Sequence, residues 1–324
     1  MVAMPEISNE NLHLERFGFV RQHEPLRLHT TYRIGGEADW FVCVDDLEKL
    51  EALVHVLNET HTPWMVLGNG SNVLVSDQPY HGVVISLMGR FMSFSFSDTI
   101  LEASAGCSLI LLSVKAMEQS LSGLEFASGI PGTLGGGIYM NAGAYLSDLS
   151  NLIIDVTYLD EEGIKTCTKD ELGFTYRHSV FQQHKNRIIL SARLQLERKD
   201  KESIRQLMDS RKQRRLSSQP VSRPSAGSVF RNPESGSAWK IVDDLGFRGK
   251  RCGGAKVSEI HSNFIINEEG KAKAAEVDCL IREIQKAALE TFGVQLITEV
   301  ERINWDEQEQ LNEQTEPGSG IESE

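Results

Sequence analysis

The sequence predicts an α+β fold in which short strands and amphipathic helices alternate. Three observations predict it: a strand–helix–strand pattern begins at Trp40, a run of short strands follows from His81, and an amphipathic helix followed by a strand ends near residue 303. Period-two alternation or short apolar runs indicate strands, and apolar residues three and four apart indicate helices. With 324 residues, the chain is long enough for two or more lobes and a cleft between them.

The first region opens with the apolar run WFVCV, which predicts a short strand. Asp45 and Glu48 resemble a capping box that would start the following helix. The run WMVLG predicts a second strand, the turn GNGSN follows it, and VLVSD predicts a third strand. One apolar face of the predicted helix contains Leu47, Leu50, Leu53, Val54 and Leu57.

The second region contains the strand candidates GVVISL, ILEASAG, NLIIDVTYLD and RIILSARLQL, with a helix over residues 108–120 and a hairpin turn at DEEG. A charged helix after residue 198 then gives way to a Ser/Pro-rich loop, which predicts a domain junction. In the last region SNFIIN and VQLITEVERI predict strands, and Gly293 caps a helix over residues 274–292. The apolar face of that helix contains Val277, Leu280, Ile281, Ile284 and Ala288.

The amino-acid composition excludes several classes of binding partner and site. The net charge of −13 argues against nucleic acid, because phosphate binding requires clustered Lys and Arg. Residues 306–324 contain seven acidic residues and no basic one, which is typical of a disordered, solvated tail. Five scattered cysteines without a C-x-x-C pair suggest neither a disulfide framework nor a zinc site, so we expect no metal and a reducing cytoplasm. No leader and no apolar run of membrane-spanning length is present, and we expect a soluble protein.

Two glycine-rich segments are candidate ligand loops. In VLGNGSNVLVSD a strand enters a turn whose backbone N–H groups could bind phosphate, although a plain hairpin turn would read the same. In GIPGTLGGGIYMNAGAY six glycines and no charged side chain could lay bare backbone along a flat ligand, or could be buried packing. Val73 replaces the third glycine of a dinucleotide fingerprint, and Ile138 and Tyr139 replace the lysine and hydroxyl residue of a triphosphate loop. Two loops of this kind suggest a dinucleotide ligand.

Several polar side chains occur in apolar or turn-forming segments. Ser228 lies in PSAGSVFRNP, which lacks the G-x-S-x-G elbow of a hydrolase, but a serine can donate a proton beside a charge; a structural loop serine is the alternative. Arg177 in FTYRHSVF and Glu299 in QLITEVERI could act in catalysis or form a structural ion pair. A basic run could bind a phosphorylated ligand or be a solvated helix face: Arg211, Lys212, Arg214 and Arg215.

Taken in order, these segments resemble the UDP-N-acetylenolpyruvoylglucosamine reductase family of flavoenzymes. The matching text is HTTYRIGGEADWFV, VLGNGSNVLVSD, GIPGTLGGGIYMNAGAY, YRHSVF, PSAGSVFRNP, GGAKVSEIHSNFIIN and LITEVERI, within residues 26–303. The resemblance implies a two-lobed FAD-binding region of the vanillyl-alcohol-oxidase/PCMH type and a C-terminal α/β substrate-binding domain. It implies an N-terminal extension over 1–25, lobe 1 over 26–80, lobe 2 over 81–203, the C-terminal domain over 204–305 and the tail over 306–324.

The resemblance also implies the chemistry. NADPH reduces non-covalently bound FAD and leaves. The enolpyruvyl ether of UDP-N-acetylglucosamine then takes a hydride from flavin N5 and a proton from a serine, a step of bacterial peptidoglycan precursor synthesis. The stretch between Arg177 and Ser228 has no room for the extra substrate-capping segment of one subtype, so the chain resembles the shorter subtype.

Carried over to this sequence, Ser228 is the expected proton donor, and Arg177 with Glu299 is the charged pair near the substrate carboxylate. The segment SSQPVSRPSAG is less basic than the family pattern, which leaves the phosphate contacts open. The expected FAD ligands are Gly68, Asn69, Gly70, Ser71, Asn72, Gly129, Ile130, Pro131, Gly132, Thr133, Gly136, Asn141, Ala142 and Gly143. The expected substrate ligands are Tyr176, Arg214, Arg215, Asn232, His261 and Asn263.

Two other functions stay open from the sequence. A flavin-dependent alcohol or sugar oxidase on the related cofactor fold would let oxygen reoxidise its flavin rapidly and would need no proton from Ser228. A non-catalytic nucleotide-binding module with an acidic tail would bind FAD or a UDP-sugar without substrate-dependent turnover.

Overall fold

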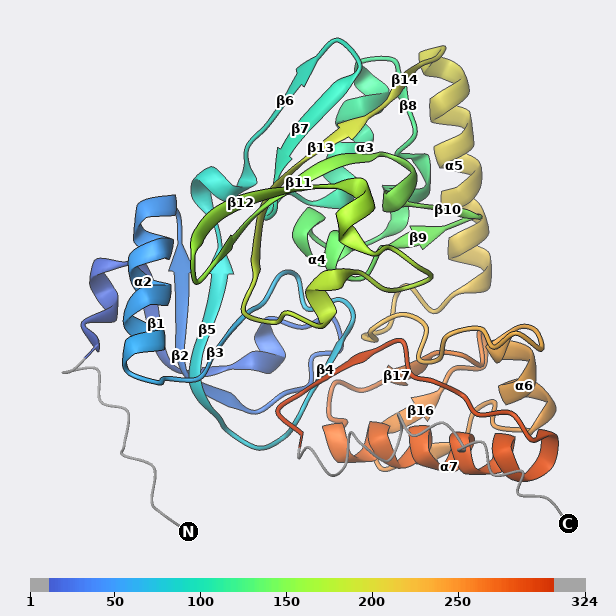
Figure 1. Cartoon of the computed structure of the whole chain (residues 1–324). Coiled ribbons are helices and arrows are strands. Elements are labelled where there is room, and N and C mark those ends of the chain that lie inside the picture. The colour runs from blue at the N-terminus through green and yellow to red at the C-terminus, as the bar shows by residue number, and fades with distance from the viewer. Residues whose placement is uncertain (1–11, 306–324) are drawn as a thin grey trace, which may run out of the picture.

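The computed structural model describes residues 12–305, which form three packed regions. Figure 1 shows the N-terminal sheet on the left, the larger second sheet above the centre and the C-terminal region at the lower right. Helix α5 (Lys201–Ser218) runs along the right side, from the second region down to the third. The junction of the three regions, near β4 (Val73–Val75), is where the segments singled out in the sequence meet.

The first region is a four-stranded sheet with α2 (Leu47–Glu59) packed against it. The predicted apolar face of α2 is confirmed, because Leu50, Leu53 and Leu57 are fully buried. The predicted cap is wrong by one residue: Asp46, not Asp45, accepts a hydrogen bond from the Glu48 N–H at 3.0 Å. The strands, in order across the sheet, are β1 (Phe19–Pro25), β2 (Glu37–Val44), β5 (Tyr80–Leu87) and β3 (Trp64–Val66).

Strand β1 falls in the segment that the sequence suggested was only an extension. It pairs antiparallel with β2, from Phe19 opposite Cys43 to Pro25 opposite Glu37. Most of its side chains are exposed, so no apolar alternation marks it in the sequence. Strand β5 pairs in parallel with both β2 and β3, so this sheet extends across the boundary expected between residues 80 and 81.

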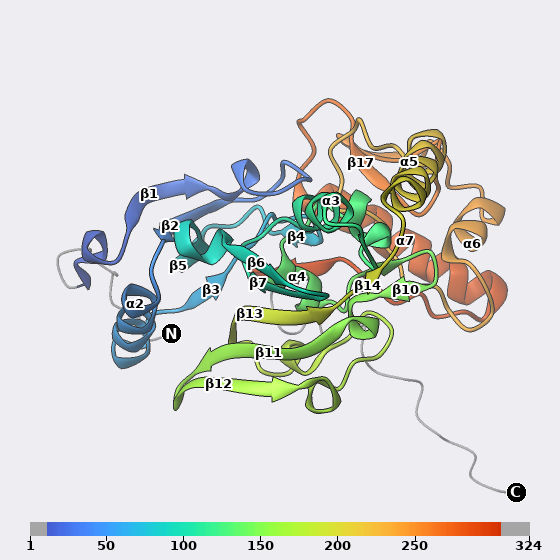
Figure 2. The ribbon, with the colours of Figure 1, turned by 90° about the horizontal axis from the view of Figure 1, so that it is seen from above.

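The second region is a five-stranded antiparallel sheet covered by α3 (Leu109–Glu118) and the short helix α4 (Leu134–Tyr139). The predicted hairpin at residues 160–163 is confirmed, because Asp160 pairs with Gly163 at its tip. The strands, in order across the sheet, are β12 (Gly163–Thr168), β11 (Ile153–Asp160), β13 (Ile188–Gln195), β7 (Ile100–Ser104) and β6 (Phe94–Ser97). Two further pairs of two-residue strands are separate from it: β8 (Leu121–Ser122) with β14 (Glu197–Arg198), and β9 (Gly143–Ala144) with β10 (Ser147–Asp148). Figure 2 shows the molecule from above, with α5 at the upper right, on the side where β10 and β14 lie.

The third region packs α6 (Ala238–Asp244) and α7 (Ala274–Phe292) around a small sheet. Helix α7 has the predicted bounds, and Gly293 ends it in the left-handed conformation with φ 65°. Tyr32 from the N-terminal part of the chain is buried in this core, and its hydroxyl donates to the Ile265 carbonyl at 2.8 Å. The sheet contains β15 (Arg251–Cys252), β16 (Ala255–Val257) and β17 (Ile265–Asn267).

The final strand is shorter than the sequence predicts. Only β18 (Glu301–Ile303) is a strand, and it pairs in parallel with β4, Glu301 opposite Val73. Just before it, Thr298 forms an isolated antiparallel bridge with Phe230. The predicted strand is interrupted because this segment pairs with two partners that run in opposite directions. The segment 297–303 therefore joins the first glycine-rich loop to the segment that contains Ser228.

Within residues 12–305 no helix is long and apolar enough to cross a membrane. All five cysteines are free thiols, and the described residues contain no cluster that could hold a metal ion. The predicted acidic tail, residues 306–324, lies outside the described residues, and so do residues 1–11 of the predicted N-terminal extension.

Candidate active site

The serine-containing segment lies directly beside Glu299. The Glu299 N–H donates to the Val229 carbonyl at 2.7 Å, and the Arg231 N–H donates to the Ile297 carbonyl at 2.9 Å. Ser228 is half-buried at the start of this pairing, and no described residue forms a hydrogen bond with its hydroxyl. Gly227 precedes it with φ 80°, a conformation that favours glycine. The segment that contains Ser228 is thus paired with the segment that contains Glu299.

Arg177 brings a positive charge to the same place from the second region. Its Nε donates to Glu299 Oε1 at 2.7 Å, and its Nη2 donates to the Gly143 carbonyl at 2.8 Å. The side chains of Arg177 and Glu299 are only 18% and 16% exposed, so water screens this pair weakly. The sequence left catalysis and a structural ion pair open for these residues, and the structure joins them beside Ser228.

Arg177 is held by a tight local turn. Its own φ is 56°, unusual for a residue other than glycine, and Thr175 and His178 form two 3.2 Å backbone hydrogen bonds around it. Gln182 donates to the Arg177 carbonyl at 3.0 Å, and Asn141 donates to the Thr175 carbonyl at 3.0 Å. Asn141 is 2% exposed, so it anchors the Arg177 turn to the second glycine-rich segment. This over-determined backbone fixes the position of the guanidinium.

The two glycine-rich segments contact each other, and the first of them also contacts the segment 297–303. Asn69 Nδ2 donates to the Pro131 carbonyl at 2.9 Å, which ties the first loop to the second. Asn72 Nδ2 donates to the Glu299 carbonyl at 3.0 Å, and the Asn72 carbonyl accepts from the Glu301 N–H at 2.9 Å. The loops expected to hold one ligand therefore form one surface that ends at Glu299.

The glycines of the second segment serve two purposes. A Cβ added at Gly137 would lie 2.9 Å from Leu109 and Leu149, and one at Gly143 would lie 2.5 Å from Asp148, so these positions are glycine because protein packs there. At Gly132 the nearest atom would be Ser71 Oγ at 3.5 Å, and at Gly136 it would be Thr133 Oγ1 at 3.4 Å. The packing alternative is confirmed at Gly137 and Gly143, whereas at Gly132 and Gly136 a Cβ would make only ordinary van der Waals contact, and contact with a flat ligand stays a prediction.

A groove of about 1200 Å³ lies beside the second glycine-rich segment and is lined by residues of that segment, of α5 and of the third region. Arg214 is exposed on one wall, and Tyr145 lies beside it with its ring centroid 6.0 Å from the guanidinium carbon. Arg215 also lines the groove, and its Nη1 donates to the Gly129 carbonyl; burial lowers the pKa of this guanidinium. Both arginines expected near the nucleotide line the groove, and Arg215 is also bonded to the second glycine-rich segment. The groove is lined by Phe126, Ser128, Gly129, Ala144, Tyr145, Leu146, Arg211, Lys212, Arg214, Arg215, Leu216, Ser217, Ser218, Gln219, Val221, Trp239, Arg248, Ile260 and His261.

Two of the predicted substrate ligands bind backbone groups. Asn263 is 4% exposed; its Oδ1 accepts from the Phe230 N–H at 2.9 Å and its Nδ2 donates to the Phe230 carbonyl at 2.8 Å. Asn232 Oδ1 accepts from the Ala238 N–H at 3.0 Å, at the start of α6. These contacts hold the chain that follows Ser228, and substrate contact by either amide stays a prediction. Tyr176 is half-exposed against Arg177, and His261 lines the groove.

Several residues that line the groove were not among the site residues predicted from the sequence. Trp239, Arg248 and Ile260 line one wall, opposite the basic residues of α5. The only signal in the sequence is a tryptophan that directly follows the Gly/Ser-rich run ESGSA, and such a residue is as compatible with core packing.

Comparison with known proteins gives consistent results. Residues 219–303 match the family model "UDP-N-acetylenolpyruvoylglucosamine reductase, C-terminal domain", and residues 38–168 match "FAD binding domain". The chain is 43% identical over 296 residues to the UDP-N-acetylenolpyruvoylglucosamine reductase of Agathobacter rectalis, covering 87% of this chain and 93% of the relative. It is 42% identical over 287 residues to that of Bacillus subtilis, covering 88% and 94%. The crystal structure of the Thermus caldophilus reductase aligns with TM-score 0.77 at 34% identity, covering 88% of this chain and 100% of that one.

Proposed function

The chain belongs to the UDP-N-acetylenolpyruvoylglucosamine reductase family, and from that premise we propose which of its residues perform the reaction. It is an FAD-containing oxidoreductase that reduces UDP-N-acetylenolpyruvoylglucosamine in peptidoglycan synthesis. The observation that supports the assignment of residues is that Glu299 bonds the Arg177 side chain and that its backbone pairs with Val229, the residue after Ser228. NADPH as the reductant and a cytoplasmic location are proposals from the family resemblance.

The two glycine loops fit a flat dinucleotide. They are in contact through Asn69 and Pro131, residues 68–72 and 129–145 contain no charged side chain, and a Cβ at Gly132 or Gly136 would not clash with the protein. Backbone N–H groups of such loops can bind a pyrophosphate, and missing side chains let a planar ring approach closely. We assign FAD to this surface, held by residues 68–72, 129–133, 136 and 141–143. When bound, FAD supplies the hydride that the enolpyruvyl double bond accepts.

Arg177 and Glu299 orient and stabilise the carboxylate end of the substrate. Addition of a hydride to the methylene carbon leaves negative charge on the carbon that bears the ether oxygen, and the adjoining carboxylate shares that charge. A fixed guanidinium in a weakly screened site stabilises such a charge without having to reorganise. Glu299 holds the Arg177 side chain by its 2.7 Å contact, and the Gly143 carbonyl fixes its other end.

Ser228 Oγ donates the proton to the carbon bearing the ether oxygen. A hydroxyl is a weak acid, so the transfer requires a strongly basic acceptor and a nearby cation. The paired segments place Ser228 one residue from the Val229 carbonyl that binds Glu299, and Glu299 binds Arg177. Arg214 on the groove wall is the side chain we assign to the nucleotide end of the substrate.

The test is Ser228→Ala in the flavin-loaded enzyme. We expect flavin reduction by NADPH to stay nearly intact, and reoxidation by the enolpyruvyl substrate to slow about 10²-fold or more, the range of lost general-acid catalysis. Stopped-flow absorbance of the flavin band separates the two half-reactions. Ser222→Ala, in the exposed part of the same loop, is the matched control and should leave both rates unchanged.

Equal slowing of both half-reactions in Ser228→Ala would reject the proton-donor role. Reoxidation by air at the rate seen with the enolpyruvyl substrate would instead favour an oxidase. A protein that binds FAD but shows no substrate-dependent reoxidation would be a binding module.

A further inference from the structure

Two cysteines lie opposite each other in the third region, and the proposed reaction uses neither of them. Cys252 is the last residue of β15, and Cys279 lies in the first half of α7. Their thiols share a hydrogen bond. Both are free and partly exposed, and the groove is lined by other residues. Small molecules from solvent can therefore reach a pair of adjacent thiols outside the candidate active site.

Contacts on either side of the thiol pair fix the register between strand and helix. On one side Lys250 Nζ binds Glu283 Oε2 at 2.6 Å, and on the other the Gly254 N–H donates to Glu276 Oε2 at 2.9 Å. The pairing of β15 with β16 extends back to Lys250, whose carbonyl accepts from the Val257 N–H at 2.9 Å. Positions two apart share a face of a strand, and positions three or four apart share a face of a helix. The thiol pair is thus the middle one of three contacts in a single register.

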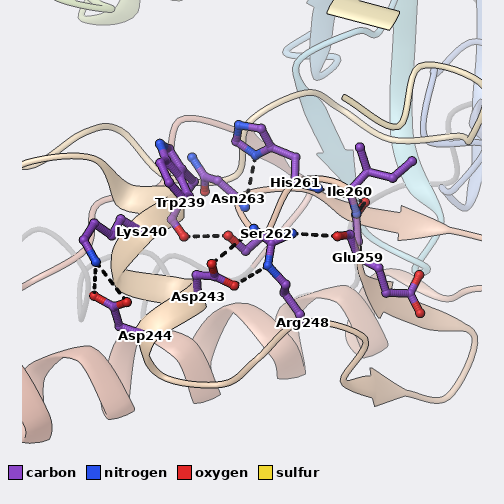
Figure 3. Close-up of polar contacts among 11 residues, drawn as sticks. Trp239, Lys240, Asp243, Asp244, Arg248, Glu259, Ile260, His261, Ser262 and Asn263 are labelled. Atoms are coloured by element: carbon purple, nitrogen blue, oxygen red, sulfur yellow. Dashed lines mark hydrogen bonds and ion pairs between the residues drawn. The ribbon is translucent and has the colours of Figure 1, made fainter. Parts of the chain in front are cut away.

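The hairpin that contains Cys252 is held at its tip and at its base. At the tip Glu276 binds the turn that follows Cys252. At the base Arg248 binds the Asp243 carboxylate of α6, and its Nη1 donates to the Glu259 carbonyl at 2.6 Å (Figure 3). A disulfide requires the two sulfur atoms to close from hydrogen-bonding distance to about 2.05 Å. A hairpin fixed against α7 keeps the sulfur atoms within reach of each other.

We propose that Cys252 and Cys279 form a redox-active dithiol that peroxide oxidises reversibly to a disulfide between β15 and α7. The first thiolate attacks a peroxide oxygen, the O–O bond breaks, and a sulfenic acid forms while the released hydroxide takes up the proton of that thiol. The second thiol attacks the sulfenic sulfur, the S–O bond breaks, and the oxygen leaves as water with the second thiol proton. Each thiol thus loses one hydrogen, and one peroxide is reduced to two water molecules. A dithiol reductant restores both thiols by exchange.

The surroundings of Cys279 decide which thiol reacts first. The hydrogen bond with Cys252, together with burial and the Glu283 charge, raises the pKa of Cys279 to about 11. Its Sγ also donates to Glu283 Oε1 at 3.8 Å. Because the thiolate is the nucleophile, a thiol with a raised pKa reacts slowly with peroxide at neutral pH. We therefore assign the sulfenic acid to Cys252 and the second attack to Cys279.

The disulfide fastens the small sheet that supports the Ser228 segment. In β17 the Asn267 N–H donates to the Pro224 carbonyl at 2.9 Å, and just before β17 the Asn263 carbonyl accepts from the Val229 N–H at 2.9 Å. The S–S bond closes the loop 252–279 and so restricts the unfolded chain, which stabilises the folded protein. Oxidation therefore makes the third region harder to unfold.

The first experiment treats the FAD-loaded, fully reduced protein with a few molar equivalents of hydrogen peroxide at pH 7. Remaining thiols are alkylated, and the protein is digested without reduction for mass spectrometry. We expect the peptides of Cys252 and Cys279 to be linked and two hydrogen atoms lighter than the free pair. Two of the five thiols should disappear in a thiol titration, and dithiothreitol should restore both.

The second experiment removes one thiol at a time. Cys279→Ser should stop at a sulfenic acid on Cys252 that dimedone labels, whereas Cys252→Ser should leave Cys279 mostly unlabelled. Cys167→Ser is the matched control and should form the disulfide as the parent does. Cys167 is also partly exposed and burial raises its pKa to about 11, but its Sγ donates to the Val156 carbonyl at 3.6 Å.

The third experiment compares melting temperatures before and after oxidation. The parent and Cys167→Ser should gain about 5 °C or more, and dithiothreitol should reverse the gain. Cys252→Ser should not gain.

Three outcomes would overturn the proposal. Both thiols could stay free while peroxide oxidises glutathione added to the same sample, or Cys252 could be linked to a different cysteine. Cys252 could also pass to sulfinic acid in the parent, which would show that Cys279 does not reach it in time. A linked pair with an unchanged melting temperature would reject the fastening of the third region. None of these measurements involves turnover, so their result is independent of the proposed function.

Discussion

Two arginine–carboxylate pairs involve residues in or just before β18, and their geometry is similar. Arg177 and Glu299 approach to 2.7 Å, and Arg302 and Asp278 approach to 2.6 Å. The first pair joins the second region to the segment just before β18, and its side chains are 18% and 16% exposed. The second joins β18 to α7 inside the third region, with side chains 5% and 10% exposed.

The difference lies in what surrounds each pair. The Arg302–Asp278 pair is the more buried one; Arg282 Nε also binds the Asp278 carboxylate at 2.6 Å, and the Arg302 guanidinium lies 5.5 Å from the Trp305 ring centroid. The Arg177–Glu299 pair adjoins the segment that contains Ser228 and the two glycine-rich segments. Depth of burial therefore does not identify the functional pair; the neighbouring groups do.

Breaking the structural pair should have the largest effect. Asp278→Ala leaves the buried Arg302 without the carboxylate that α7 supplies, and we expect the free energy of unfolding to fall by about 3–5 kcal/mol. Alanine is the better helix former, so helix propensity does not explain such a loss. Urea unfolding followed by circular dichroism measures it, and turnover per folded molecule should stay normal. A fall in turnover at full stability would show that this pair also serves the reaction.

Breaking the pair beside Ser228 should act on rate. Glu299→Gln keeps an oxygen acceptor for Arg177 Nε but removes the negative charge, and we expect reoxidation of the flavin by substrate to slow about 10²–10³-fold. The melting temperature should change little. Single-turnover absorbance and a thermal melt of the same sample give both values. If Glu299→Gln melted far below the parent and retained its rate, the comparison would be reversed.

Glu301, the first residue of β18, gives the smallest expected effect. Burial raises the pKa of Glu301, and Lys185 and Arg231 offset this only in part. Because the folded protein holds this proton more tightly than the unfolded chain, the free energy of unfolding falls as pH rises through the raised pKa.

Glu301→Gln should therefore stabilise the protein at about pH 8 by less than about 1 kcal/mol and have almost no effect near pH 4. Urea midpoints at the two pH values measure the difference. A larger gain at the acidic value would mean that the ionised carboxylate is the stabilising form.

Prediction from sequence succeeded where a signal is local. The α7 helix has the bounds that its apolar spacing and Gly293 predict, and the Asp160–Gly163 turn forms the predicted hairpin. It failed where pairing is distant. Strand β1 has few buried side chains and exists because β2 lies beside it, and the segment before β18 is divided between two partners. The candidate residues were recognised by their segments, but the roles of Asn263 and Arg215 in holding backbone depend on contacts with Phe230 and Gly129.

The sequence by itself determined the helices, the glycine loops and the presence of Ser228, Arg177 and Glu299, because spacing and residue type are properties of short segments. Only the tertiary structure decided that Arg177 meets Glu299, which lies 122 residues away, and that a Cβ would clash at some glycines of the second segment but not at Gly132 or Gly136. It also decided that Trp239 faces the basic residues of α5 across a groove. Periodicity encodes which face of an element is buried, but it does not encode which distant element will lie against that face.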